Sequence, residues 1–168
     1  MTAAAHAPQP GPTRFHFVSG PGEGGNALGL LRVLAQNPRF AVREGSGAMP
    51  LFDGSTARCT ARGTPEAYLR PAQQRALLRG LFEAVHHDHP PGCAVFDSDP
   101  GWIDRAEALS ALFPLARFLL VMRHASLGHP VLGGPLAGRV VAVEALRLAR
   151  DPESVFDDIY HALREPPF

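Results

Sequence analysis

Residues 15–36 read FHFVSGPGEGGNALGLLRVLAQ and contain three successive structural signals. The apolar segment 15–19 predicts a short strand, and leucines at helical spacing predict a helix over 26–36. The glycine-rich turn 20–25 joins these two elements. A strand, a tight turn and a helix in this order are typical of the first unit of an α/β sheet.

The alternation of strands and helices continues along the chain. Further strands are expected at 40–43, 93–96, 117–122 and 139–143, and further helices at 64–87, 104–113 and 151–163. Segment 44–63, which carries four glycines, is expected to be a loop, and so is 124–138. The pattern predicts an α/β fold with a short parallel sheet of four or five strands flanked by helices.

Composition excludes several classes of function. The chain of 168 residues has 16 basic and 16 acidic side chains, and all the basic ones are arginine. Without lysine there is no Schiff-base chemistry and no GxxxxGK[ST] phosphate loop. A net charge of zero gives no general attraction to nucleic acids or anionic membranes. A small-molecule acceptor or a protein partner is therefore expected, with no nucleic acid and no membrane.

The length suits one domain with its own core. Residues 1–14, a mixture of Ala, Pro and Gly without periodicity, predict a disordered tail, and 15–168 predict a single α/β domain. Cys59 and Cys93 are far apart without CxxC spacing, which predicts neither a disulfide framework nor a zinc ribbon. No signal peptide and no apolar stretch of about 20 residues is evident, so a cytoplasmic protein is expected.

The glycine-rich turn is the first candidate site. Its glycines allow backbone N–H groups to converge on an anion at the start of the following helix. Gly20, Gly22 and Gly25 match GxGxxG, and Glu44 falls near the distance of a ribose-binding acid, which makes dinucleotide binding one hypothesis. Glu23 counts against it, because a carboxylate would lie where pyrophosphate binds. A turn that binds no ligand is the other interpretation.

Other candidates lie along the predicted strands. His16 is either a packed strand histidine or a general base. Asp97 and Asp99 follow the third strand at the edge where functional residues collect. Asp97 is the stronger catalytic candidate, able to orient an acceptor hydroxyl or accept its proton, with capping of the loop as the alternative. Trp102 is expected to pack at the start of a helix.

The run His86-His87-Asp88-His89 raises the question of a metal site. Adjacent histidines project in different directions, whereas tetrahedral coordination needs convergent ligands. The run is therefore interpreted as the solvated end of a helix, and no metal site is predicted.

Five segments, in order, resemble bacterial sulfotransferases that use 3′-phosphoadenosine 5′-phosphosulfate (PAPS). They are FHFVSG…QNPRF (15–40), LLRGLFEA (77–84), VFDSDPGW (95–102), ALFPLARFLLVMR (111–123) and ARDPESVFDDIYHALREPPF (149–168). The resemblance covers almost the whole chain. It implies a P-loop-like α/β core and transfer of a sulfuryl group from PAPS to a hydroxyl or amine acceptor.

The resemblance also implies where PAPS would bind, and the chain departs from the family there. The family's turn has a basic residue followed by Ser and Thr, but this chain has Glu23 at the basic position and Ala27 at the threonine. At 4 Å and an effective dielectric near 20 a unit-charge pair is worth about 4 kcal/mol, so the reversal is costly. The implied contacts are Gly20, Gly22, Glu23, Gly24, Gly25, Asn26 and Ala27.

The second implied contact is Arg123, which matches the family's arginine for the 3′-phosphate, while Val131 stands where the family has a serine. A helical insertion that normally covers the acceptor is absent. An impaired sulfotransferase is therefore expected. The alternatives are a catalytically inactive relative that acts as a binding or regulatory module, and the dinucleotide-binding protein described above.

Overall fold

The computed structural model describes residues 13–20, 27–123 and 130–165. It contains one sheet of five parallel strands in the order β2-β3-β1-β4-β5. The strands are β1 (Arg14–Ser19), β2 (Phe40–Glu44), β3 (Ala94–Ser98), β4 (Phe118–Met122) and β5 (Val140–Glu144). The predicted α/β fold with a short parallel sheet is therefore confirmed.

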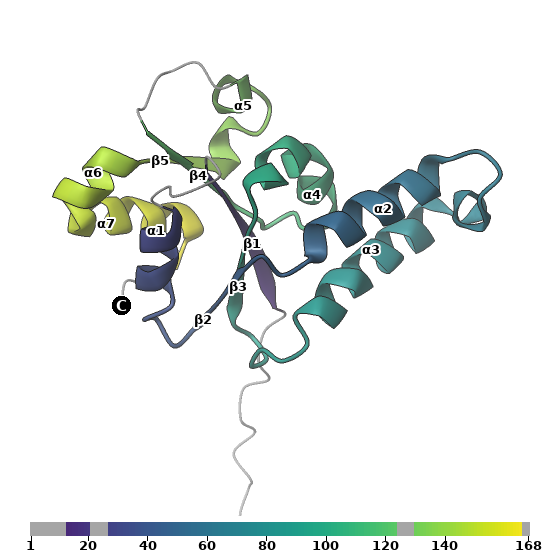
Figure 1. Cartoon of the computed structure of the whole chain (residues 1–168), viewed down its shortest axis with the longest axis horizontal. Coiled ribbons are helices and arrows are strands. Elements are labelled where there is room, and N and C mark those ends of the chain that lie inside the picture. The colour runs from purple at the N-terminus through teal and green to yellow at the C-terminus, as the bar shows by residue number, and fades with distance from the viewer. Residues whose placement is uncertain (1–12, 21–26, 124–129, 166–168) are drawn as a thin grey trace, which may run out of the picture.

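Helices cover both faces of the sheet (Figure 1). The α-helices are α1 (Ala27–Leu34), α2 (Ala48–Thr60), α3 (Pro71–Val85), α4 (Ala106–Leu112), α5 (Pro130–Gly133), α6 (Ala145–Arg150) and α7 (Pro152–Leu163). Three 3₁₀ helices, η1 (Pro65–Tyr68), η2 (Pro100–Arg105) and η3 (Ala137–Arg139), lie between them. One core joins the sheet to α2, α3 and α4, and the other joins it to α1 and α7.

The central strand β1 supplies side chains to both cores, as alternation along a strand requires. Phe15 and Phe17 belong to the core beneath α2, α3 and α4. Val18 belongs to the opposite core, and the ring of His16 lies 5.1 Å from that of Phe96 in the same core. Because β1 is hydrogen-bonded on both edges and covered on both faces, its end is held firmly in place.

Most of segment 44–63, which was expected to be a loop, forms helix α2. Helix α2 buries only Ala48, Phe52 and Cys59, so its apolar periodicity is weak. Pro50 falls in the first turn, where a helix does not need the missing N–H group. The helix is stabilised by packing against its neighbours: α2 lies beside α3, and the pair projects from the sheet in Figure 1.

The predicted helix 64–87 is two elements. Pro65 begins the 3₁₀ helix η1, and a new helix, α3, begins at Pro71. A proline inside a helix removes a backbone hydrogen bond and clashes with the preceding turn, so the helix restarts there. The N–H of Arg70 donates to Oε1 of Gln73 at 2.9 Å and secures the new start.

The remaining differences concern short elements. Part of the predicted loop 124–138 forms α5 and η3, and α6 was not predicted. Residues 124–129 and most of the predicted tail 1–14 lie outside the described residues. Both cysteines are free. Within the described segments, no helix combines the length and the apolar composition needed to cross a bilayer.

Candidate functional site

The carboxyl ends of the parallel strands meet at one edge of the sheet. At this edge β1 leads to α1, which covers one face, whereas the neighbouring strand β3 leads to η2 and α4, which cover the other. In open α/β sheets a crevice forms where neighbouring strands connect to opposite faces, and ligands bind there. The candidate site is therefore the edge around the ends of β1, β3 and β4.

Gly20 lies directly after β1 at this edge. A Cβ atom on Gly20 would lie 3.3 Å from Cβ of Ala27 and 3.4 Å from Cβ of Val121. The end of β1, the first residue of α1 and the end of β4 therefore meet closely at a glycine. The other predicted residues of the turn (Gly22, Glu23, Gly24, Gly25 and Asn26) lie outside the described residues.

Arg123 follows β4, the strand next to β1, so it lies at the same edge as Gly20. Its side chain is exposed, and it forms no hydrogen bond or ion pair with the residues that the structure describes. Val131, at the position of the family's serine, packs against the core from α5. Among the described residues, Arg123 is therefore available at this edge to bind an anion.

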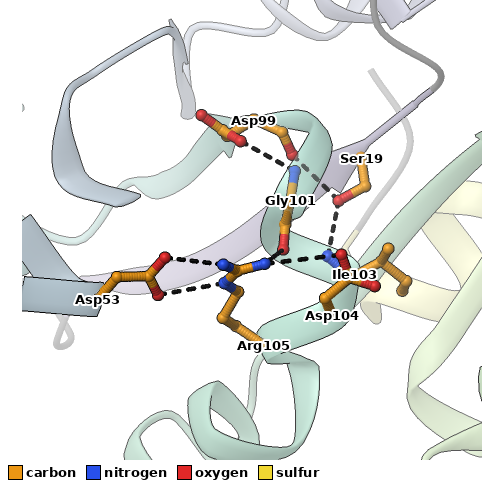
Figure 2. A network of polar contacts seen from close by, with 7 residues as sticks. All are labelled: Ser19, Asp53, Asp99, Gly101, Ile103, Asp104 and Arg105. Atoms are coloured by element: carbon orange, nitrogen blue, oxygen red, sulfur yellow. Dashed lines mark hydrogen bonds and ion pairs between the residues drawn. The ribbon is translucent and has the colours of Figure 1, made fainter. Parts of the chain in front are cut away.

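Ser19 connects the end of β1 to η2 (Figure 2). Its Oγ donates to the carbonyl oxygen of Asp99 at 3.1 Å and accepts the N–H of Ile103 at 2.9 Å. Oδ1 of Asp99 accepts the N–H of Gly101 at 2.9 Å and caps η2. These contacts fix η2 beside the end of β1, and Oδ2 of Asp99 has no hydrogen-bond partner among the described residues.

An ion pair ties α2 to the same element. Nε and Nη2 of Arg105 lie 3.1 and 2.8 Å from the two carboxylate oxygens of Asp53, and Nη1 donates to the carbonyl oxygen of Gly101 at 3.3 Å (Figure 2). The hydrogen bonds with Asp53 raise the pKa of Arg105 above its ordinary value. Sequence reasoning missed Ser19, Asp53 and Arg105, because no local motif indicates contacts across 52 or 84 residues.

Asp97 is fully buried, and both of its carboxylate oxygens are engaged. Oδ2 accepts the hydroxyl of Ser46 at 2.6 Å and lies 2.8 Å from Nε2 of His86. Oδ1 accepts the indole N–H of Trp102 at 3.2 Å. Asp97 therefore has no free oxygen for an acceptor, and its position points to a structural role that joins β3 to α3, η2 and the segment before α2.

The histidine run differs in part from the expected solvated helix end. His87 and Asp88 are exposed, but His86 is buried against Phe15 and Phe82 and pairs with Asp97. The solvated interpretation is thus wrong for His86, because a long-range partner made its burial possible. In the described part of the chain, no group of three or more His, Cys, Asp or Glu side chains is arranged to hold a metal ion.

His16 is packed within the sheet, as one of its two interpretations expected. Its Nδ1 accepts the N–H of Arg117 at 3.1 Å, and its Nε2 is buried without a partner. Burial, with smaller effects from the charges of Arg14 and Arg117, lowers the pKa of His16 to about 3. The ring lies inside the sheet, away from the edge. Trp102 is fully buried, as expected of a packing residue.

The strand order bears on the dinucleotide hypothesis. Glu44 ends β2 and pairs with Ser98, so β3 lies between β2 and β1. The dinucleotide-binding fold places its second strand next to the first, in the order 3-2-1-4-5-6. Glu44 is two strands from Gly20, about 10 Å across the sheet. The order therefore removes the ribose-binding acid on which this hypothesis depended.

A pocket of about 380 Å³ lies beside the edge, between η2 and α4 on one side and α5 and η3 on the other. Its lining is Ile103, Asp104, Ala106, Glu107, Pro130, Val131, Gly134, Pro135 and Leu136. The volume falls in the range of small-molecule sites. Sequence reasoning did not predict this pocket, because its walls come from segments that only the fold brings together.

Comparison with known proteins supports the fold. No protein-family model and no curated protein matches the sequence. Among solved structures, the chain is similar to the sulfotransferase domain of the olefin synthase from Synechococcus PCC 7002, with 18% sequence identity and a TM-score of 0.54. The similarity covers 95% of this chain and 75% of that domain. The α/β sheet and its flanking helices therefore form a sulfotransferase-like fold.

Proposed function

We propose that this protein is an impaired sulfotransferase that binds PAPS at the carboxyl edge of its sheet and transfers the sulfuryl group slowly to a hydroxyl or amine acceptor. The observation that carries the proposal is that Arg123, beside the end of β1, is exposed and has no ion-pair partner among the described residues, at the edge where α/β sheets bind ligands. The sulfotransferase-like fold and the five resembling segments support the same function.

The residues at this edge suit the nucleotide part of PAPS better than its phosphosulfate. Arg123 suits a phosphate, because a guanidinium forms charge-assisted hydrogen bonds with phosphate oxygens. Gly20 lets the end of β1 pack closely against the start of α1 and the end of β4, which brings these backbone segments together at the edge. Ala27, the first residue of α1, has no hydroxyl for the phosphosulfate, and the sequence places the carboxylate of Glu23 in the same turn. The nucleotide is therefore expected to bind more readily than the sulfuryl group is transferred.

Binding is tested first with the nucleotide product, 3′,5′-adenosine bisphosphate, by calorimetric titration. We expect Arg123→Ala to weaken binding about 10- to 100-fold, because a hydrogen bond to a charged group contributes about 1.5–3 kcal/mol. Arg75→Ala removes the same charge from the exposed surface of α3 and should leave the affinity unchanged. Absence of nucleotide binding by the parent chain, and also by the variant described next, would overturn the proposal.

The double variant Glu23→Arg, Ala27→Thr tests the cause of the impairment. It restores the charge and the hydroxyl of the resembling family, so both nucleotide affinity and sulfuryl transfer should rise. If only the variant transferred the sulfuryl group and the parent showed no turnover, the second candidate function would be favoured. In this function the protein is a catalytically inactive relative that serves as a binding or regulatory module. The absent hydroxyl at Ala27 is the observation that favours this second candidate.

Slow transfer of the sulfuryl group also needs a general base that removes the proton from the hydroxyl or amine of the acceptor. Among the described carboxylates at the edge, Asp99 suits this role, because it is partly exposed and only its Oδ1 is engaged. In the proposed step, Oδ2 takes the proton as the acceptor oxygen or nitrogen bonds to sulfur and the bond from sulfur to the nucleotide phosphate breaks.

Replacing Asp99 with asparagine separates this role from capping. Asparagine keeps an oxygen for the N–H of Gly101 but does not accept a proton at neutral pH. We expect Asp99→Asn to lower transfer at least about 100-fold, the usual contribution of a general base, with nucleotide affinity unchanged. The rate is measured by mass spectrometry of the sulfated product of the Glu23→Arg, Ala27→Thr background. An undiminished rate would exclude Asp99 as the base.

A further inference from the structure

The pocket between η2, α4, α5 and η3 is mostly apolar. Ile103, Val131 and Leu136 contribute branched side chains to it, and Pro130 and Pro135 contribute rings. Its volume of about 380 Å³ lies at the lower end of the 300–1,000 Å³ usual for ligand sites. A compact ligand with one aromatic ring is therefore a better match than an extended chain or a polysaccharide.

The charged side chains among the described residues of the lining all carry the same sign. Asp104 and Glu107 lie on consecutive turns of η2 and α4, and this described lining contains no basic residue. The arginines that follow Asp104 in η2 and end η3 have partners of their own: Arg105 pairs with Asp53, with Asp104 at 3.6 Å as a weaker partner, and Arg139 donates to the carbonyl oxygen of Ser110. The pocket therefore combines an apolar body with carboxylates at its rim.

A hydrogen bond joins the wall of the pocket to the carboxyl edge of the sheet. The N–H of Ile103, which lines the pocket, donates to Oγ of Ser19 at 2.9 Å, and Ser19 immediately precedes Gly20. Asp99, the proposed base, is the N-cap of the same 3₁₀ helix, η2. The opposite wall of the pocket includes Pro130, the first residue of α5, which follows β4 in the chain. The pocket is therefore built on η2, the element that Ser19 joins to the end of β1 and that Asp99 caps.

From this arrangement we infer that the pocket binds the acceptor, and that the acceptor is a small aromatic molecule bearing an ammonium group. The apolar walls hold the ring, while Asp104 and Glu107 attract the cation and repel anionic molecules of the same size. The identification of the bound molecule as the acceptor rests on the proposed function. The preference of the pocket for an aromatic cation stands on the lining alone.

Three probes with the same phenol ring test the preference: tyramine is cationic, 4-ethylphenol is neutral and 3-(4-hydroxyphenyl)propionate is anionic. Binding is measured by NMR titration of the isotopically labelled full chain, with the shifts expected at the residues of the pocket. We expect tyramine to bind about tenfold more tightly than 4-ethylphenol and the anion to bind least. Equal binding of the three probes, or shifts outside the pocket, would overturn the inference.

Two kinds of variant separate charge from shape. Asp104→Asn with Glu107→Gln should abolish the preference for tyramine and leave 4-ethylphenol unaffected, whereas Glu153→Gln with Asp157→Asn, an equal charge change on the exposed surface of α7, should alter neither. Gly134→Leu adds volume where a Cβ would make an ordinary contact of 3.5 Å with the carbonyl oxygen of Pro130. It should weaken tyramine and 4-ethylphenol alike. A preference that survives loss of both carboxylates would contradict the inference.

The outcome is distinguishable from that of the proposed function. If tyramine binds the pocket in Arg123→Ala as it does in the parent, the cation site holds independently of the nucleotide. If 3′,5′-adenosine bisphosphate binds but the three probes bind equally, the proposed function stands and this inference fails. If tyramine is preferred but no variant binds nucleotide, the pocket is a cation site and its acceptor role is refuted.

Discussion

Replacing Asp97 with alanine is expected to lower the free energy of unfolding by about 3–5 kcal/mol, because three side chains would lose the carboxylate with which they form hydrogen bonds. The side chains of Asp97 and His86 are each only 1% exposed, so no water replaces the lost carboxylate. His86, Trp102 and Ser46 would all lose a hydrogen-bond partner at once. Urea unfolding followed by the fluorescence of Trp102 measures the loss directly.

Two further variants make the result specific. Asp97→Asn preserves the shape and one acceptor oxygen, so it should be less damaging than Asp97→Ala. Asp157→Ala removes an exposed carboxylate from α7 and should change stability by no more than about 0.5 kcal/mol. If Asp97→Ala were as mild as Asp157→Ala, Asp97 would not be the structural junction that its contacts describe.

The sequence was most informative where local signals and packing agree. The strand before the glycine-rich turn and the apolar segments at 93–96 and 117–122 were found because a strand buried on both faces is continuously apolar. Asp151 was correctly placed at the start of the last helix, where its side chain accepts the N–H of Ser154. The resemblance to sulfotransferases rested on these same segments.

The errors lie where tertiary contacts outweigh local propensity. Helix α2 contains Pro50 and Gly54, residues that indicate a loop, but Ala48 and Phe52 pack into a core that α3 helps to form. The burial of His86 depended on Asp97, a partner eleven residues away across a turn. No periodicity or motif in a single sequence reveals such a pairing.

Some residues of the candidate site were predicted from the sequence and others were not, again because tertiary contacts decide their positions. Gly20 was predicted from the glycine-rich turn and Arg123 from the resemblance to sulfotransferases, and the parallel strands β1 and β4 bring the two to the same edge. Strand order, however, does not follow from the alternation of elements, so the sequence left Glu44 as a possible neighbour of the turn until β3 was found between them. The pocket of Asp104 and Glu107 needed α5 and η3 to be positioned across from α4, which only the fold provides.

Acid is expected to destabilise the protein through His16. Burial lowers its pKa to about 3, whereas in the unfolded chain the pKa returns to near 6.5. Between these two values the unfolded state binds more protons than the folded state, so stability falls as the pH falls from 6.5 towards 3. The slope approaches about 1.4 kcal/mol per pH unit, which amounts to about 2 kcal/mol between pH 6.5 and 5.

His16→Gln tests this directly, because glutamine keeps an oxygen that can accept the N–H of Arg117 but does not titrate. Urea unfolding at pH 7, 6 and 5 should show a steep loss of stability in the parent and a much smaller one in the variant, even if the variant is less stable at pH 7. His161→Gln, on the exposed surface of α7, should retain the steep loss. Equal slopes in all three proteins would mean that His16 is protonated in the folded state, and that its ring is more accessible to water than its packing against Phe96 implies.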